Sequence, residues 1–139
     1  MKSLGMVFLV LGLTQGVVAG EISVSISNVT STDGEMVFGV FDSEAAYKDQ
    51  TNPKYSGRTN VSDKQNGFII TDVPTGDYTV VIYQDKNKDG KLNQGMFGRP
   101  TEPYGFSRNP RITFSAPKYK DVVFKVAADK KTSLDIRLK

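Results

Sequence analysis

Residues 78–84 (YTVVIYQ) decide the fold class, because they carry the strongest strand signal in the chain. The run consists largely of β-branched and aromatic residues, which fit a pleated backbone better than a helix. Residues 74–77 (PTGD) precede it and place proline, glycine and aspartate where a tight turn needs them. Residues 67–73 before that turn read as another strand, so the centre of the chain predicts β-structure.

The N-terminal half extends this pattern. Residues 21–29 alternate between apolar residues and serines, which predicts a half-buried strand. Residues 35–41 (EMVFGVF) are apolar on both faces and predict a central strand. Residues 43–50 (SEAAYKDQ) begin with a serine that can cap a helix, and they predict one short helical turn. Residues 52–66 are polar and turn-rich, so we expect a surface excursion there.

The C-terminal half contains a long irregular stretch followed by strands. Residues 85–106 hold four glycines and two prolines without periodicity, which predicts a loop. Residues 111–115 are expected to form a short edge strand. Residues 121–127 (DVVFKVA) and 132–138 (TSLDIRL) read as strands and are predicted to pair with each other as a hairpin across residues 129–131.

Many short strands with turns between them and almost no helix indicate an all-β domain. Antiparallel sheets with one exposed face explain the alternation, and packing two of them together buries both inner faces. We therefore expect an immunoglobulin-like or prealbumin-like β-sandwich of about seven antiparallel strands. A small barrel remains the alternative. Residues 20–139 are enough for one such domain.

The first residues have the pattern of a secretory leader. Lys2 precedes an apolar run at residues 4–13 (LGMVFLVLGL), and small or modest side chains end at Ala19. The run is shorter than the roughly 20 apolar residues that span a membrane, and it lacks the alternation of a strand. We predict a signal peptide at residues 1–19 and an exported domain, periplasmic or extracellular, at residues 20–139, with no transmembrane segment after cleavage.

The composition narrows the chemistry that the domain can perform. The chain has no cysteine and no histidine, which excludes disulfides and thiolate zinc sites and removes the usual general base. The formal net charge of +3 and the absence of long runs of like charge argue against a nucleic-acid partner. A bound metal would need oxygen ligands, which indicates a hard cation such as calcium.

Residues 85–93 (DKNKDGKLN) follow the calcium-loop pattern over nine positions. Oxygen-bearing side chains occupy positions one, three and five, and Gly90 at position six permits the sharp turn. Calcium needs a chain that wraps tightly and points alternate oxygens inward. The predicted ligands are the side chains of Asp85, Asn87, Asp89 and Asn93 and the backbone carbonyl of Lys91.

The pattern then departs from a helix-flanked calcium loop. Position twelve is Met96, where a bidentate glutamate is expected, so a ligand must come from elsewhere. Glu102, Asp42 and Asp72 are the candidates, and Glu102 is nearest in sequence. Calcium is the cofactor that we expect. Three lysines in the loop weaken its field, and a metal-free turn stays open as the alternative.

Residues 98–109 (GRPTEPYGFSRN) are a second unusual stretch. Two prolines and two aromatic residues within a polar segment predict an ordered loop. The two aromatic residues, Tyr104 and Phe106, could fold back and plug one end of the sandwich, which is the interpretation that we favour. Alternatively they form a binding surface together with Arg99 and Arg108.

Residues 74–107 (PTGDYTVVIYQDKNKDGKLNQGMFGRPTEPYGFS) resemble the signature of a bacterial family of exported proteins called domain of unknown function 2141. The shared succession is a Pro-x-Gly-x-Tyr turn and strand, an Asp- and Asn-rich loop, and a segment ending in Glu-Pro-Tyr-Gly-Phe-Ser. The resemblance implies an exported β-sandwich. It implies no activity.

Three functions fit these observations. The first is a calcium-stabilised binding or structural module of the periplasm or cell surface. Its partner stays open, with an envelope protein or a glycan as the candidates. The second is a carboxylate-dependent, glycan-acting enzyme that uses Asp85, Asp89 or Glu102 as acid and base, because glycoside hydrolysis needs only two carboxyl groups. The third is an envelope-assembly partner that uses an open sheet edge for strand addition.

The leader generates the first testable prediction. Ala19 is the last small residue before the first alternating strand, so the exported protein should begin at Gly20. Intact-mass measurement on protein recovered after export checks this. A mass that retains Lys2 would contradict the leader assignment.

Overall fold

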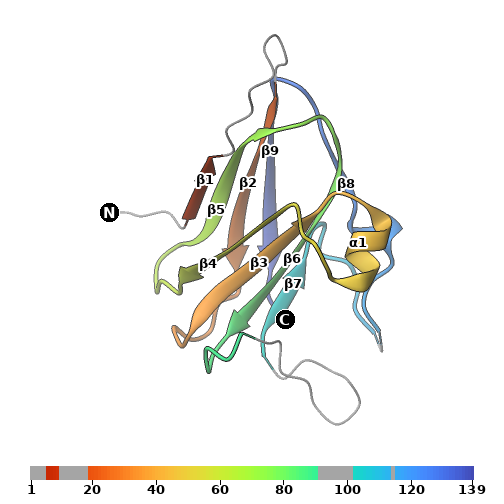
Figure 1. Cartoon of the computed structure of the whole chain (residues 1–139). Coiled ribbons are helices and arrows are strands. Elements are labelled where there is room, and N and C mark those ends of the chain that lie inside the picture. The colour runs from red at the N-terminus through yellow and green to blue at the C-terminus, as the bar shows by residue number, and fades with distance from the viewer. Residues whose placement is uncertain (1–5, 10–18, 91–101, 114) are drawn as a thin grey trace.

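The computed structural model of the chain describes residues 6–9, 19–90, 102–113 and 115–139, and it is mostly β (Figure 1). Nine strands and two short helices are described in these ranges. In chain order they are β1 (Met6–Leu9), β2 (Gly20–Ser27), β3 (Glu35–Phe41), α1 (Glu44–Asp49), β4 (Tyr55–Asn60), β5 (Asn66–Val73), β6 (Gly76–Asp85), β7 (Tyr104–Phe106), α2 (Tyr119–Val122), β8 (Phe124–Val126) and β9 (Lys131–Arg137).

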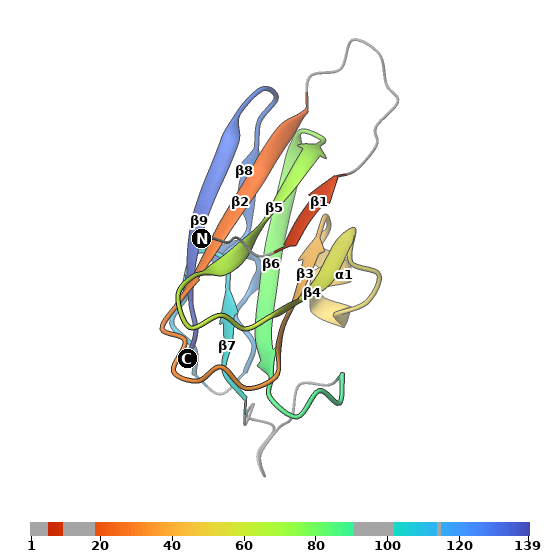
Figure 2. The ribbon, with the colours of Figure 1, turned by 90° about the vertical axis from the view of Figure 1, so that its left-hand side faces the viewer.

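The strands form two sheets that face each other (Figure 2). The first sheet has the order β1-β5-β2-β9, and the second has the order β4-β3-β6-β7, with β8 also paired to β6. This confirms the expected class of two packed sheets with little helix. The expectation of antiparallel strands throughout is wrong, because β2 pairs with β9 in parallel and β1 pairs with β5 in parallel.

The main core lies between the two inner faces. Phe38 of β3 stacks on Phe68 of β5 with ring centroids 3.7 Å apart and an interplanar angle of 6°, so this contact joins the sheets directly. Alternate residues along each strand supply the rest of the core, as the period of two requires. The fully enclosed aliphatic residues include Ile22, Val40, Ile70, Val80, Ile82 and Ile136.

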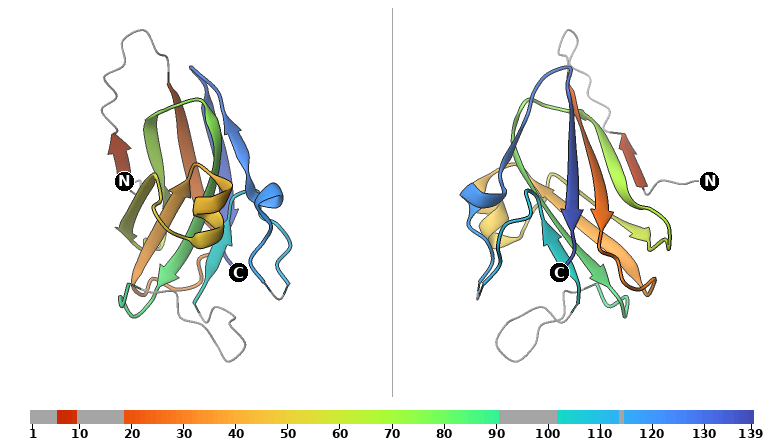
Figure 3. Two further views of the ribbon diagram at one scale, coloured as in Figure 1. Left: turned by 45° about the vertical axis from the view of Figure 1, so that its right-hand side comes forward. Right: turned by 180° about the vertical axis from the view of Figure 1, so that it is seen from behind.

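A second, smaller apolar cluster covers the outer face of the second sheet. The helices α1 and α2 lie side by side over this face (Figure 3). Tyr47 of α1 meets Phe41 and Phe106 edge to face, and Val122 of α2 is fully buried among them. The Tyr47 hydroxyl donates a hydrogen bond of 2.6 Å to the carbonyl of Pro117. Burial, with a smaller contribution from the charge of Asp121, raises the pKa of Tyr47 to about 12.

The expected helical turn at residues 43–50 is confirmed as α1. The Ser43 side chain accepts a hydrogen bond of 3.1 Å from the backbone N–H of Ala46, as a capping serine should. Gln50 ends the helix in the left-handed conformation, with its N–H directed to the last turn. Local sequence signals therefore suffice to define this element.

The predicted C-terminal hairpin is wrong. The strand β8 pairs with β6 in the second sheet, whereas β9 pairs with β2 in the first. The turn between them therefore crosses from one sheet to the other. Alternation shows which side chains face the core, but it does not select the neighbouring strand. The parallel pairing of β2 with β9 places Ile136 opposite Ile26 in the core.

Three other expectations need correction. The excursion at residues 52–66 contains the edge strand β4, and the long loop at residues 85–106 ends in β7. No strand is formed by residues 111–113 or 115, the described part of the expected edge strand. The missed strands β4 and β7 lie at or near the edges of the second sheet, where one side lacks a neighbour and the apolar pattern is weak.

The structure also places part of the predicted leader. The strand β1 lies against β5, with Met6 opposite Phe68 and Leu9 opposite Thr71. Residues 1–5 and 10–18 of the leader lie outside the described residues, so cleavage after Ala19 stays a prediction. Among the helices that are described, none has the length and hydropathy to cross a membrane.

The Phe38–Phe68 stack yields a stability prediction. Both rings are 2% exposed, so Phe38→Ala should leave a cavity between the sheets and lower the free energy of unfolding by about 3–5 kcal/mol. Val37→Ala in the same strand but on its outer, partly exposed face should cost about 1 kcal/mol or less. Urea denaturation measures both. Equal losses for the two variants would contradict the sandwich core.

Candidate functional site

A group of three carboxylates is the candidate site. Asp85, Asp89 and Glu102 each place one carboxylate oxygen within 4.8 Å of the others. Asp85 ends β6 and Asp89 lies in the following turn, while Glu102 comes from the segment that leads into β7. The residues therefore come from two separate stretches of chain at the same end of the second sheet.

The strand period explains why Asp85 lies where it does. Its neighbour Gln84 points toward the sheet interface and donates hydrogen bonds of 3.0 and 2.8 Å to the carbonyls of Ser31 and Asp33. Asp85 therefore points to the opposite, outer face of the sheet. Its side chain is 0% exposed, so this charge needs partners within the protein.

Backbone N–H groups of the loop supply part of that compensation. Asp85 Oδ1 accepts a hydrogen bond of 3.1 Å from the N–H of Asp89, and Oδ2 accepts one of 2.7 Å from the N–H of Gly90. Gly90 has a φ of 79°, the left-handed region that glycine adopts without steric cost. The loop therefore folds back around the carboxylate that begins it.

Arg58 is the other partner of Asp85, and no sequence pattern pointed to it. Its Nη1 lies 3.0 Å from Glu35 Oε1 and 3.5 Å from Asp85 Oδ2. Arg58 comes from β4, which pairs with β3, and Glu35 of β3 is opposite Asp85 of β6. The arginine thus reaches across three strands. In the sequence, Arg58 is a single basic residue within residues 52–66, which were predicted to be a surface excursion.

Glu102 is held by the chain that returns toward β7. Its Oε2 accepts a hydrogen bond of 2.8 Å from the N–H of Lys86, and the residue is 7% exposed. The carbonyl of the next residue, Pro103, accepts a hydrogen bond of 2.9 Å from the N–H of Gln84. These two bonds place the glutamate beside the start of the loop, so residues 16 positions apart in sequence meet.

Tyr83 lines the same face. Its hydroxyl donates a hydrogen bond of 3.2 Å to the carbonyl of Gly90. Burial raises the pKa of Tyr83, and the negative charge of Asp85 raises it further, while the charge of Arg58 opposes that rise. The phenol therefore stays protonated and acts as a donor that ties the end of the loop to the sheet.

The predicted ligands are only partly brought together. Asn87 Oδ1 accepts a hydrogen bond of 3.3 Å from the N–H of Asp89, which is an Asx turn within the loop. Lys91 and Asn93 lie outside the described residues. The structure therefore unites three of the predicted carboxylates and leaves the remaining ligands as predictions.

The alternative ligands Asp42 and Asp72 lie elsewhere. Asp42 follows Phe41, which is opposite Thr79, six residues before Asp85 in β6. Six residues of strand span about 20 Å, so Asp42 is at the far end of the sheet. Both aspartates instead act on Tyr55, whose pKa is raised first by burial and then by their charges. Of the three candidates, only Glu102 joins the loop carboxylates.

The aromatic residues of the stretch 98–109 pack into the second apolar cluster. Phe106 of β7 is buried in the second cluster, and Tyr104 packs against that cluster. Arg108 donates hydrogen bonds to the carbonyls of Lys120 and Val123, while Arg99 lies outside the described residues. The expectation that the aromatic residues fold back is correct, but they form an edge strand rather than a plug.

The Asp85 geometry yields a prediction in the absence of metal. Asp85→Ala should lower the free energy of unfolding by about 2–3 kcal/mol, because two backbone donors lose a charged acceptor. Arg58→Ala should cost about 1 kcal/mol or less, since the Arg58 side chain is 43% exposed and its ion pairs are screened by solvent. Urea denaturation in a chelating buffer measures both. A larger loss for Arg58→Ala than for Asp85→Ala would show that Arg58, rather than the backbone N–H groups, is the main stabilising partner of Asp85.

Comparison with known proteins adds the family. No curated protein and no solved structure matches the chain. The model of one family, described as an uncharacterized protein conserved in bacteria (DUF2141), matches residues 24–135. The matched region runs from β2 to β9 and includes the Asp85 loop and Glu102. This confirms the resemblance inferred from residues 74–107, and the chain belongs to the DUF2141 family of uncharacterized proteins conserved in bacteria.

Proposed function

We propose that this protein is an exported β-sandwich module, with a binding or structural role in the bacterial periplasm or outside the cell, and that calcium stabilises its Asp85 loop. The observation that carries the calcium proposal is the convergence of Asp85, Asp89 and Glu102 within 4.8 Å. The leader-like segment at residues 1–19 supports export. The two facing sheets support an immunoglobulin-like or prealbumin-like fold, although the parallel β2–β9 pair departs from a purely antiparallel version.

Calcium suits this group better than other metals. Hard cations prefer oxygen ligands, and calcium accepts six to eight of them in irregular geometry. The three carboxylates would supply the charge, while Asn87, Asn93 and the carbonyl of Lys91 would complete the shell. Magnesium demands a near-octahedral set and keeps its waters, so it should bind less well.

Arg58 sets the expected strength of binding. Its guanidinium already neutralises part of the charge on Asp85, so an ion at the cluster would compete with it for Oδ2. Lys86 and Lys88 in the loop add further repulsion. We therefore expect a dissociation constant on the order of 10⁻⁴–10⁻³ M, the range of extracellular calcium modules.

The geometry does not favour a glycan-cleaving enzyme. Such an enzyme needs two carboxyl groups that reach the substrate from opposite sides of the scissile bond. Asp85 and Glu102 are buried, and each accepts backbone hydrogen bonds, which leaves Asp89 as the exposed member of the group. A ligand or structural role uses this arrangement better than acid–base chemistry does.

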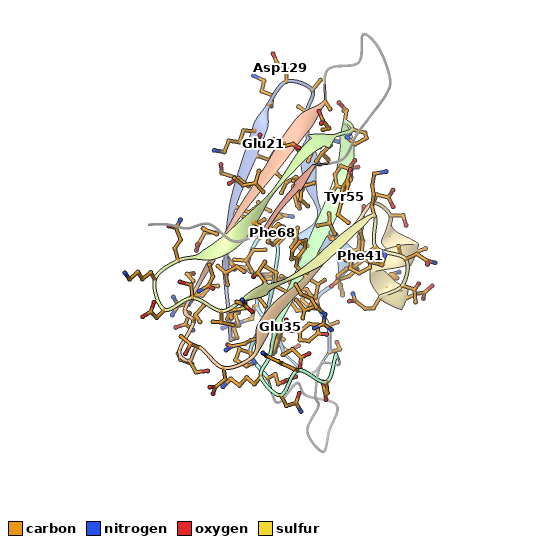
Figure 4. The ribbon with its side chains drawn as sticks, turned by 60° about the vertical axis from the view of Figure 1, so that its left-hand side comes forward. Glu21, Glu35, Phe41, Tyr55, Phe68 and Asp129 are labelled. Atoms are coloured by element: carbon orange, nitrogen blue, oxygen red, sulfur yellow. The ribbon has the colours of Figure 1, made fainter. Side chains whose placement is uncertain are left out.

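The calcium proposal predicts a stability shift that depends on Asp89. Addition of about 2 mM calcium should stabilise the wild type by roughly 0.6–1.8 kcal/mol, or a few degrees in melting temperature. Asp89→Asn should abolish the shift. Asp129→Asn is the matched control, because Asp129 lies at the opposite end of the sandwich from Glu35 and the cluster (Figure 4), and its left-handed backbone suits asparagine.

Arg58→Gln sharpens the test. Removing the competing cation should increase the calcium-induced shift above that of the wild type, even if the metal-free variant melts earlier. Each shift is therefore read within one variant, with and without calcium, by scanning calorimetry. Identical melting temperatures with and without calcium in both the wild type and Arg58→Gln would mean that the loop is a metal-free turn.

A further inference from the structure

The outer edge of β5 differs from the other sheet edges in the part of the chain that the structure describes. Its stretch Phe68–Thr71 (FIIT) contains no charged residue and no proline. By contrast β9, at the other edge of the same sheet, carries Lys131, Asp135 and Arg137. In the second sheet β7 has only three residues, and β4 carries Arg58. Charges and short length are the usual protection of an edge strand. β5 is eight residues long, and its only charged residue, Asp72, lies outside the stretch that pairs with β1.

A strand of the same chain occupies this edge in the structure. Residues Met6–Leu9 pair with Phe68–Thr71 in parallel and in continuous register. The strand β1 lies beside β5 and also contacts β4 of the second sheet (Figures 1 and 2). The β5 edge therefore accepts an uncharged, extended segment, and the sequence M-V-F-L is the example that the structure provides.

We propose that, in the exported protein, this edge is a strand-addition site for an extended apolar segment of a partner protein, which runs parallel to β5 in place of Met6–Leu9. The inference rests on the export half of the proposed function, because β1 belongs to the predicted leader and leaves with it. It does not depend on calcium. Backbone N–H and C=O groups of β5 provide the affinity, and the uncharged stretch Phe68–Thr71 favours an apolar partner segment.

The occupant is a single segment rather than a second copy of the chain. Two identical β5 edges related by a two-fold axis would pair antiparallel, whereas the pairing seen here is parallel. A second copy would also bring its own neighbouring strands, while β1 has none of the described strands on its outer side. A free segment of about four residues matches the register that the structure provides.

Cysteine cross-linking tests this proposal without interference, because the chain has no native cysteine. The probe is a soluble peptide that contains M-V-F-L between lysine residues, with cysteine in place of the residue corresponding to Val7. Val7 is opposite Ile69, so the protein variant is Ile69→Cys in the exported, leader-free protein. A second register-matched pair, Thr71→Cys with cysteine at the position of Leu9, covers a failure of the first variant to fold.

Two matched controls define the expected result. Ser133→Cys places an exposed thiol on β9, at the other edge of the same sheet. A peptide with proline at the position of Phe8 loses a backbone donor and cannot add as a regular strand. Ile69→Cys should cross-link to the M-V-F-L peptide about tenfold faster than Ser133→Cys does, and about tenfold faster than it cross-links to the proline peptide. A tenfold ratio corresponds to roughly 1.4 kcal/mol of pairing free energy.

Three outcomes would overturn the inference, and each points to a different error. Equal cross-linking rates for Ile69→Cys and Ser133→Cys would show that the edge selects no strand. Peptide-free, disulfide-linked dimers of Ile69→Cys that outcompete the peptide would identify a second copy as the occupant. Exported protein whose intact mass retains residues 1–19 would mean that β1 closes the edge permanently, and this outcome alone also contradicts the export half of the proposed function.

Discussion

Burial of β6 on both of its faces is the constraint on which the rest of the structure depends. On the inner side Val80 and Ile82 are fully enclosed between the two sheets. On the outer side Val81 packs against the second apolar cluster, and Thr79 is fully buried. A strand covered on both sides needs a layer beyond its own sheet, and α1 and α2 supply that layer here. The short helices are therefore part of the core architecture.

The same constraint creates the acidic site. Since β6 continues as far as Asp85, the alternation of the strand directs this carboxylate to the covered outer face at the end of the sheet. A buried carboxylate must be compensated, and the loop N–H groups together with Arg58 provide this. These hydrogen bonds fold the loop back onto Asp85, and Glu102 accepts a hydrogen bond from the N–H of Lys86 beside it. A spacing typical of calcium loops is thus held by the protein's own donors, and any cation must compete with them.

The Asp85 cluster and the outer edge of β5 offer different chemical groups for binding. At the Asp85 end, charges from β3, β4 and β6 meet, and the site is electrostatic. At the outer edge of β5, the available groups are backbone hydrogen-bonding groups of the uncharged stretch Phe68–Thr71, and β1 pairs with this stretch. In the two proposals, calcium stabilises the first region and a partner segment binds at the second. The proposals for the two regions are independent because they share no residue.

Local sequence patterns determined β2, β3, β5, β6 and α1, because period-two alternation and a capping serine act over a few neighbouring residues. The spacing of Asp85, Asn87 and Asp89 also predicted an oxygen-rich turn, since the wrapping of a short loop is local. Only the tertiary structure decided which strands are neighbours, and so which distant side chains meet. Alternation assigns a side chain to a face but not to a partner strand, which is why the β8–β9 hairpin was wrong and Arg58 was missed. The choice of Glu102 over Asp42 and Asp72 likewise required the register of β3, β6 and β7, which depends on burial across the whole sandwich.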